Sequence, residues 1–239
     1  MKWLEKKARP EILRLAPYVS ARSELADASG LVALDANENP WVPYPQTPDM
    51  AMVNRYPDPQ PISLLSRMAN FYGVQANQIF VGRGMDEAIE LLIRVFCRAY
   101  QDNIVTFKPT FTYYKVAADI QGVETRELAL GAAPEFKLDI KNLLSLCDDN
   151  TKIMFICTPN NPTGNSISLA ELELILQTKL EIVLAVDEAY LEFSPYASAS
   201  QVMNKYDNLA VTKTMSKAFA YARVRIGSMM AQAPTIERI

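Results

Sequence analysis

The segment 152-KIMFIC-157 predicts a β-strand that is buried on both faces, and 181-EIVLAV-186 repeats the pattern further along the chain. Both segments are short and almost continuously apolar, as a parallel sheet covered by helices on its two sides requires. Helical patterns precede and follow these segments, which is the arrangement of α/β units. The sequence therefore predicts an α/β fold with a mostly parallel, doubly wound sheet.

Alternating elements extend in both directions from these two segments. A helical stripe is predicted from Ile62 to Tyr72, with Gly73 as its C-terminal cap. The next predicted helix follows Gly84, and its apolar residues have the spacing of one helical face: Ala88, Leu91, Leu92, Val95 and Phe96. Further strands are predicted at 78–81, 103–107, 123–128, 209–212 and 225–233, and further helices at 111–120, 138–147 and 168–177.

The first 60 residues differ in composition from the rest. The segments 40-PWVPYPQTP-48 and 57-PDPQP-61 exclude long helices because proline lacks a backbone donor. We interpret residues 1–60 as an N-terminal arm with a segment of a smaller domain. Residues 61–239 are interpreted as one large domain.

Composition narrows the classes of function. The formal net charge of −3 gives no basic face for nucleic acid, and no apolar run is long enough to span a bilayer. The start of the chain lacks the uninterrupted apolar core of a signal peptide, so a cytoplasmic protein is expected. Cys97, Cys147 and Cys157 have no CxxC spacing and are expected to be buried thiols. The chain has no histidine, which excludes Ser/His and Cys/His pairs and the usual zinc sites, so no metal is expected.

Polar residues follow three of the predicted strands, in 158-TPNNPTG-164, 187-DEAY-190 and 213-KTMSK-217. Ligands bind outside the carboxyl ends of the strands in such a sheet. Each motif also has an ordinary explanation, because NNPTG suits a turn and a single lysine is usually a solvated charge. Asp187 and Glu188 would suit the magnesium site of an ATPase, but the partner motif GxxxxGK[ST] is absent.

Together, the three motifs fit the chemistry of pyridoxal phosphate. In 212-TKTMSKAFAYARVRIG-227, the Lys217 amine could form a Schiff base with the aldehyde of this cofactor. Thr214, Ser216 and Arg225, two helical turns further on, would hold its phosphate near a helix N-terminus. Asp187 would keep the ring nitrogen protonated so that the ring accepts electrons.

Other residues supply the remaining contacts that this cofactor needs. Asn161 and Tyr190 would hydrogen-bond the ring hydroxyl, and Phe111 would lie on the face of the ring. Glycines at 82 and 84 would let a backbone N–H of Met85 or Asp86 approach the phosphate at a helix start.

An ordered series of motifs resembles the aspartate-aminotransferase-type (fold type I) pyridoxal phosphate enzymes, and among them the histidinol-phosphate aminotransferases. The resemblance runs from about Pro17 to the end of the chain. Its motifs are 17-PYVSAR-22, 35-DANENP-40, 54-NRYPDPQP-61, 82-GRGMDEAIELLIRVF-96, 109-PTFTYY-114, 158-TPNNPTG-164, 187-DEAYLEF-193 and 214-TMSKAFA-220.

The resemblance implies a pyridoxal phosphate-dependent aminotransferase of histidine biosynthesis, with histidinol phosphate as amino donor and 2-oxoglutarate as the 2-oxo acid. It implies that Lys217 holds the cofactor and then moves a proton between the substrate's α-carbon and the cofactor. It also implies a homodimer in which Tyr56 reaches the phosphate of the other subunit. Tyr18 and Asn37 would face the substrate.

Two features depart from the family pattern. Arg223 stands where the family tends to have a small residue, either crowding the phosphate site or pointing to solvent. The chain stops at Ile239, so we expect the C-terminal small domain, with its arginine for the substrate carboxylate, to be absent. Three alternatives therefore stay open: a truncated non-catalytic remnant, a decarboxylase of a phosphorylated amino acid and an aromatic aminotransferase.

Overall fold

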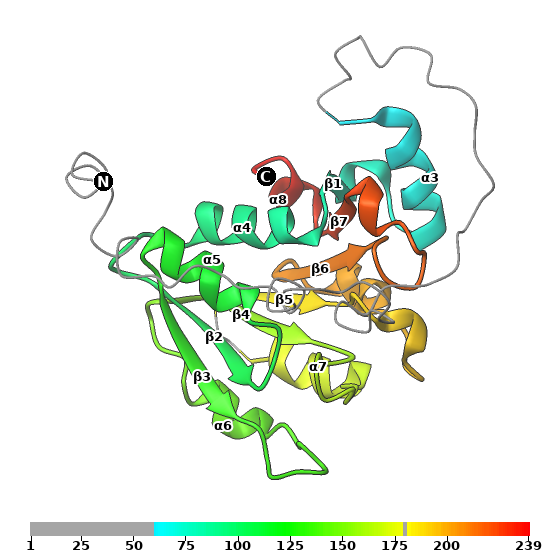
Figure 1. Ribbon diagram of the computed structural model, residues 1–239. Helices are drawn as coiled ribbons and strands as arrows, with labels where there is room; N and C mark the ends of the chain where they lie inside the picture. Colours follow the sequence, from blue (N-terminus) through cyan, green and yellow to red (C-terminus); the bar gives the residue numbers. More distant parts are fainter. Residues whose placement is uncertain (1–59, 179–180) are drawn as a thin grey trace, which may run out of the picture.

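A seven-stranded sheet forms the centre of the protein in the computed structural model, which describes residues 60–178 and 181–239 (Figure 1). The strand order is β1-β7-β6-β5-β4-β2-β3. The strands are β1 (Ile79–Arg83), β2 (Asn103–Lys108), β3 (Glu124–Ala129), β4 (Thr151–Cys157), β5 (Val183–Asp187), β6 (Leu209–Thr214) and β7 (Ile226–Met230).

The direction of the strands confirms the predicted mostly parallel sheet. β2 is parallel to both β3 and β4, and the β4–β5 and β5–β6 pairs are also parallel. β7 runs antiparallel to both of its neighbours, β1 and β6. As a result, the carboxyl ends of β1, β2, β4, β5 and β6 and the start of β7 meet at one edge of the sheet.

Helices cover both faces of the sheet (Figure 1). α4 and α5 pack against each other on one face, whereas α6 and α7 pack together on the other. The helical segments are α3 (Ile62–Tyr72), α4 (Met85–Phe96), α5 (Tyr113–Gln121), α6 (Ile140–Leu144), α7 (Leu169–Leu176) and α8 (Ala233–Ile236), with the 3₁₀ segments η2 (Ala76–Gln78), η3 (Leu191–Phe193), η4 (Ala199–Lys205) and η5 (Ala222–Val224).

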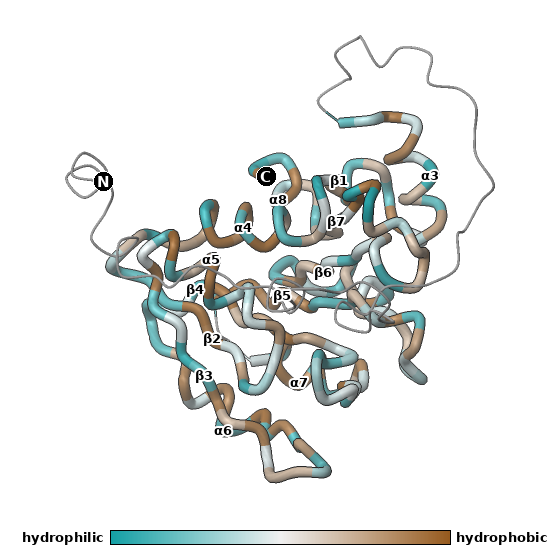
Figure 2. Tube along the Cα trace, viewed as in Figure 1, coloured by the Kyte–Doolittle hydropathy of each residue, from teal (hydrophilic) through white to brown (hydrophobic). Residues whose placement is uncertain are grey.

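The central strands explain why the apolar runs predicted the fold. Every residue of β6 is buried, as are Ile153 to Cys157 of β4 and Leu184 to Asp187 of β5. Figure 2 shows the apolar residues concentrated along these strands and on the side of α4 that faces the sheet. In contrast, β3 lies at the edge of the sheet and has no fully buried residue.

α3 ends at Gly73 as predicted, with a left-handed φ of 70°. The prediction for α4 is only partly correct. Its buried face consists mainly of Ala88, Ile89, Leu92 and Ile93, while Val95 is 40% exposed. The sequence ELLIRVF is apolar on two adjacent faces, so its pattern alone does not determine which one meets the sheet.

The remaining differences concern α6 and one cysteine. α6 is shorter than the predicted 138–147: Asp139 caps its start by accepting a hydrogen bond from Asn142 N at 3.0 Å, and the helix ends at Leu144. Cys97 and Cys157 are buried as expected, but Cys147 is only half-buried. It follows α6 in the connection to β4, outside the helical packing that the longer predicted helix would have provided.

Candidate active site

A cavity of about 300 Å³ opens where the strand ends meet. Its volume is at the lower end of the range of small-molecule pockets. All ten predicted site residues within the described part of the chain line it: Met85, Asp86, Phe111, Asn161, Asp187, Tyr190, Thr214, Ser216, Lys217 and Arg225. Tyr18, Asn37 and Tyr56 lie outside the described residues. The cavity therefore collects side chains from the ends of β2, β4, β5 and β6 and the starts of α4 and β7.

Lys217 lies in a turn that follows β6. Its Nζ is 5.8 Å from the centroid of the Tyr190 ring. The turn is closed by hydrogen bonds from Met215 N to Ile226 O at 3.0 Å and from Tyr221 N to Met215 O at 2.9 Å. The expected spacing of two helical turns to Arg225 is wrong, because the segment after Lys217 contains only bends, turns and the short η5. Chain reversal, and not helical spacing, places Lys217 and Arg225 on the same cavity.

The donors predicted for a phosphate gather at the start of α4. Thr214 and Ser216 are buried, and the Ser216 backbone N–H donates to Thr214 Oγ1 at 3.1 Å. The guanidinium of Arg225 reaches the same place, since a Cβ built on Gly84 would lie 2.5 Å from Arg225 Nη2. The free N–H groups of α4 begin at Met85, directly after Gly84, and its dipole favours a negative charge there.

Gly227 is the residue that lets α4 begin so close to the sheet. It pairs with Gly82 of β1 and with Thr214 of β6. A methyl group on Gly227 would clash with the backbone of Gly84 and Met85. Backbone atoms at a helix start have little freedom to move aside, so a glycine is required between these three segments.

We expect Gly227→Ala to lower the free energy of unfolding by roughly 3 kcal/mol through overpacking. Gly73→Ala is the matched control, because Gly73 has a positive φ but no atom within 4 Å of the added Cβ. Its left-handed backbone should cost about 1 kcal/mol. Urea unfolding of both variants measures the difference, and equal losses would show that the contact at Gly227 is not tight.

Two charged side chains, Asp86 and Arg225, lie close together at the start of α4. Asp86 Oδ2 lies 4.0 Å from Arg225 Nη2. Burial raises the pKa of the Asp86 carboxyl, and the nearby Arg225 guanidinium partly offsets this. Arg223 is exposed and does not line the cavity, so the second of its two expected positions, toward solvent, is the one observed.

Asp187 is the last residue of β5, and its carboxylate is held by two neutral donors. Oδ1 accepts a hydrogen bond from Ala189 N at 2.9 Å, and Oδ2 accepts one from the Tyr114 hydroxyl. Burial raises the pKa of Asp187 to about 6, although both hydrogen bonds act in the opposite direction. A buried carboxylate of this kind is stabilised when a cation is placed against it.

This raised pKa makes the stability of the cofactor-free protein depend on pH. Between about pH 4 and about pH 6 the folded state binds more protons at Asp187 than the unfolded state, so the free energy of unfolding falls as pH rises. The contribution of Asp187 is roughly 3 kcal/mol for a pKa raised from 3.8 to about 6. The groups around it are Tyr114 of α5, Asp86 of α4, Cys157 of β4 and Glu188.

Urea unfolding of wild type and Asp187→Asn over this pH range isolates the effect. The variant lacks the titrating group, so its stability relative to wild type should increase as pH rises. Parallel pH profiles for the two proteins would contradict the assignment of the raised pKa to Asp187.

Glu188 points away from the cavity, although it is adjacent to Asp187. Its carboxylate forms a buried ion pair with Lys213 at 2.8 Å and accepts hydrogen bonds from Ser198 Oγ and Ala199 N, each at 2.6 Å. The two acidic residues therefore do not form a common metal site. Within residues 60–178 and 181–239, no group of three His, Cys, Asp or Glu residues is placed to hold a metal ion.

Two residues with polar side chains at the site were not predicted, and Ala189 and Ala222 also line the cavity. Cys157 lines the cavity and is the register partner of Asp187 across β4 and β5. Tyr114, the hydrogen-bond donor to Asp187, is fully buried in α5. The motif 109-PTFTYY-114 contained the second of these, but nothing local in it indicates a contact with a residue 73 positions away.

No helix in the part of the chain that the structure describes is long and apolar enough to cross a membrane.

Comparison with known proteins places this chain among the aminotransferases. The chain is 43% identical to the histidinol-phosphate aminotransferase of Francisella philomiragia over 95% of its own length and 61% of that relative. The corresponding protein of Parabacteroides distasonis is also 43% identical, with 97% and 64% covered. The chain thus spans less than two thirds of the length of these curated relatives.

Solved structures give the same result for the fold. The histidinol-phosphate aminotransferase of Sinorhizobium meliloti, solved in complex with pyridoxal 5′-phosphate, superimposes with a TM-score of 0.80 at 19% identity, covering 97% of this chain and 65% of that one. The aromatic aminotransferase of Pyrococcus horikoshii has a TM-score of 0.70 at 23% identity, covering 77% and 52%. The family model described as aminotransferase class I and II matches residues 31–239. The chain therefore belongs to the class I and II aminotransferase family.

Proposed function

We propose that this chain is a pyridoxal phosphate-dependent aminotransferase that takes the amino group of histidinol phosphate and passes it to 2-oxoglutarate, in histidine biosynthesis. The proposal rests on one observation: Lys217 and Asp187 line the same cavity as the side chains that could donate hydrogen bonds to a phosphate, those of Thr214, Ser216 and Arg225. The names of the relatives above support the choice of substrate, because they match the chain over nearly all of its length.

The residues of the cavity fit this cofactor. Asp187 is buried between neutral donors and would gain a cationic partner from a protonated pyridine nitrogen. The start of α4, with Ser216, Thr214 and Arg225, offers donors to a phosphate. When bound, pyridoxal phosphate supplies an aldehyde that reacts with amines and a ring that accepts electrons from the substrate's α-carbon.

Each side chain then has a defined task. The Lys217 amine would hold the aldehyde of the cofactor and, when free, would accept and return the proton of the substrate's α-carbon. Asp187 would keep a proton on the ring nitrogen. Asn161 and Tyr190 would hydrogen-bond the ring hydroxyl, and Phe111, which also lines the cavity, would cover a face of the ring.

The proposal extends to the organisation of the chain. Residues 1–60 form an arm with a segment of a smaller domain, and residues 61–239 form the cofactor-binding domain. The working unit is a homodimer in which Tyr56 reaches the phosphate of the opposite subunit, while Tyr18 and Asn37 face the substrate. A cytoplasmic location is supported by the buried free thiols of Cys97 and Cys157.

A half-reaction measured by absorbance tests the function. Histidinol phosphate should convert the aldehyde form of the bound cofactor to its amine form, and 2-oxoglutarate should restore the aldehyde form. Lys217→Ala loaded with the cofactor is the control for slow uncatalysed exchange.

Other donors distinguish the remaining alternatives. Faster conversion by an aromatic amino acid would indicate an aromatic aminotransferase, and release of carbon dioxide from a phosphorylated amino acid would indicate a decarboxylase. Cofactor binding without conversion by any donor would show that the chain is a non-catalytic remnant.

A further inference from the structure

Tyr114 occupies a fixed position beneath the cavity. It is the second residue of α5, and its side chain is fully buried. Its ring stacks on Phe155 of β4, with the centroids 4.7 Å apart and the planes within 8°. Phe111 packs edge-on against it, with the centroids 5.5 Å apart. These two contacts leave the phenol ring one orientation, in which its hydroxyl faces Asp187.

The hydrogen bond between Tyr114 and Asp187 has a definite direction. Burial and the neighbouring Asp187 carboxylate raise the pKa of the Tyr114 phenol well above its ordinary value, so the phenol keeps its proton. It therefore donates, and Asp187 Oδ2 accepts. Hydrogen bonds donated to a carboxylate favour its charged form over its protonated form. With Ala189 N on Oδ1, both oxygens are anchored while the group still lines the cavity.

We propose that Tyr114 is a positioning residue: its buried phenol holds the Asp187 carboxylate charged and oriented toward the cavity, so that the proton shared with the cofactor stays on the ring nitrogen. This inference rests on the proposed function. Without the phenolic donor, the more basic Asp187 draws the shared proton to its own oxygen, and the ring nitrogen becomes neutral. A neutral ring accepts electrons less well, although Tyr114 itself touches neither the substrate nor the reacting atoms.

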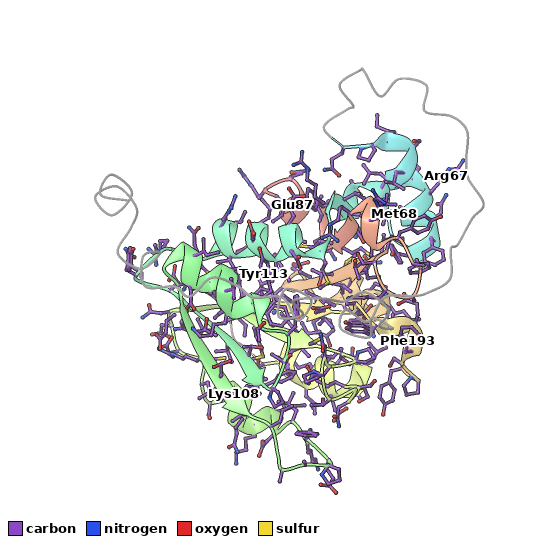
Figure 3. The ribbon with its side chains drawn as sticks, viewed as in Figure 1. Arg67, Met68, Glu87, Lys108, Tyr113 and Phe193 are labelled. Atoms are coloured by element: carbon purple, nitrogen blue, oxygen red, sulfur yellow. The ribbon has the colours of Figure 1, made fainter. Side chains whose placement is uncertain are left out.

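The chain offers a matched control in the preceding residue. Tyr113 also donates its phenolic hydroxyl to a carboxylate, Glu90 of α4. Figure 3 shows Tyr113 on α5 beside α4, and it does not line the cavity. Tyr113→Phe therefore removes the same chemical contact outside the cavity and keeps the aromatic ring that lies beside Phe111.

The experiment compares wild type, Tyr114→Phe and Tyr113→Phe, each loaded with pyridoxal phosphate that carries an NMR-active isotope at the ring nitrogen. In wild type and Tyr113→Phe, the chemical shift should report a protonated nitrogen. In Tyr114→Phe it should move toward the unprotonated value, and the affinity for the cofactor should fall about tenfold, as expected for losing a hydrogen bond to a charged group. A protonated nitrogen and unchanged affinity in Tyr114→Phe would overturn the inference.

Urea unfolding provides a second test if Tyr114→Phe is too unstable to bind pyridoxal phosphate. Phenylalanine keeps the ring that stacks on Phe155, so the main defect is the charge left at Asp187. The double variant Tyr114→Phe/Asp187→Asn should then fold without cofactor and unfold at a urea concentration close to that of Asp187→Asn alone. An equal loss of stability from Tyr114→Phe in both backgrounds would show that the phenol does not act through Asp187.

The two proposals fail in different ways. A wild-type chain that does not bind pyridoxal phosphate overturns the proposed function and this inference together. A wild type that binds with a protonated ring nitrogen, with Tyr114→Phe indistinguishable from it, overturns this inference alone.

Discussion

Replacing Lys217 by alanine is expected to abolish covalent attachment of pyridoxal phosphate and to slow the half-reaction with histidinol phosphate at least about a thousandfold. The turn after β6 brings this amine to the cavity, with its Nζ over the Tyr190 ring. Alanine leaves in place the groups that would donate hydrogen bonds to the phosphate, but it removes the Lys217 amine, which is both the nucleophile and the base. The visible absorption spectrum and a single-turnover rate measure the two effects.

Lys205→Ala is the control for this variant. Lys205 lies at the end of η4, with its side chain 66% exposed, and forms an ion pair with Glu173 at 3.7 Å. Its substitution should leave both the spectrum and the rate unchanged. A wild-type absorption band in Lys217→Ala would contradict the assignment of the attachment site.

Asp187→Asn is expected to produce the second largest loss, roughly a hundredfold to a thousandfold in the half-reaction rate. Asparagine has nearly the same shape, so the cofactor should still attach to Lys217. A neutral amide no longer stabilises the proton on the ring nitrogen, and the ring then accepts electrons poorly. Rapid-mixing absorbance of the aldehyde-to-amine conversion, with wild type beside the variant, measures this.

Asp119→Asn provides the comparison for this second prediction. Asp119 is on α5 and forms an ion pair with Lys115 at 2.6 Å, away from the cavity. Its loss should leave the rate near that of wild type. An Asp187→Asn protein with the wild-type rate would show that the charge of Asp187 takes no part in the reaction.

The location of the cavity was predictable because it depends on strand ends. Continuous apolar runs identified β4 and β5, and parallel strands must end at the same edge of the sheet. The polar residues after each strand therefore had to converge, and they do. Gly82 and Gly84 likewise indicated a helix start, and α4 begins at Met85.

The segment between Lys217 and Arg225 shows where this reasoning failed. Its composition suits a helix, but the chain must reverse there so that β7 can return antiparallel beside β6. The requirement comes from the sheet and not from the local residues. The same applies to the face of α4, because tertiary packing selects Ile89 and Ile93 over Val95.

Polar contacts between distant segments could not be predicted from the sequence either. Tyr114 meets Asp187 across 73 residues, and Lys213 meets Glu188 across the β5–β6 pair. The local sequence around each of these residues does not indicate its partner. Only the folded arrangement shows that one carboxylate of the Asp187–Glu188 pair faces the cavity while the other is neutralised in the core.

The most direct test of the central claim is to add pyridoxal phosphate to the wild-type chain, reduce it with borohydride and locate the modified residue by peptide mass mapping. One adduct, on Lys217, is the predicted result, and Lys217→Ala should yield none. Label spread over several lysines, or concentrated on a lysine other than Lys217, would contradict the account of this cavity as a pyridoxal phosphate site.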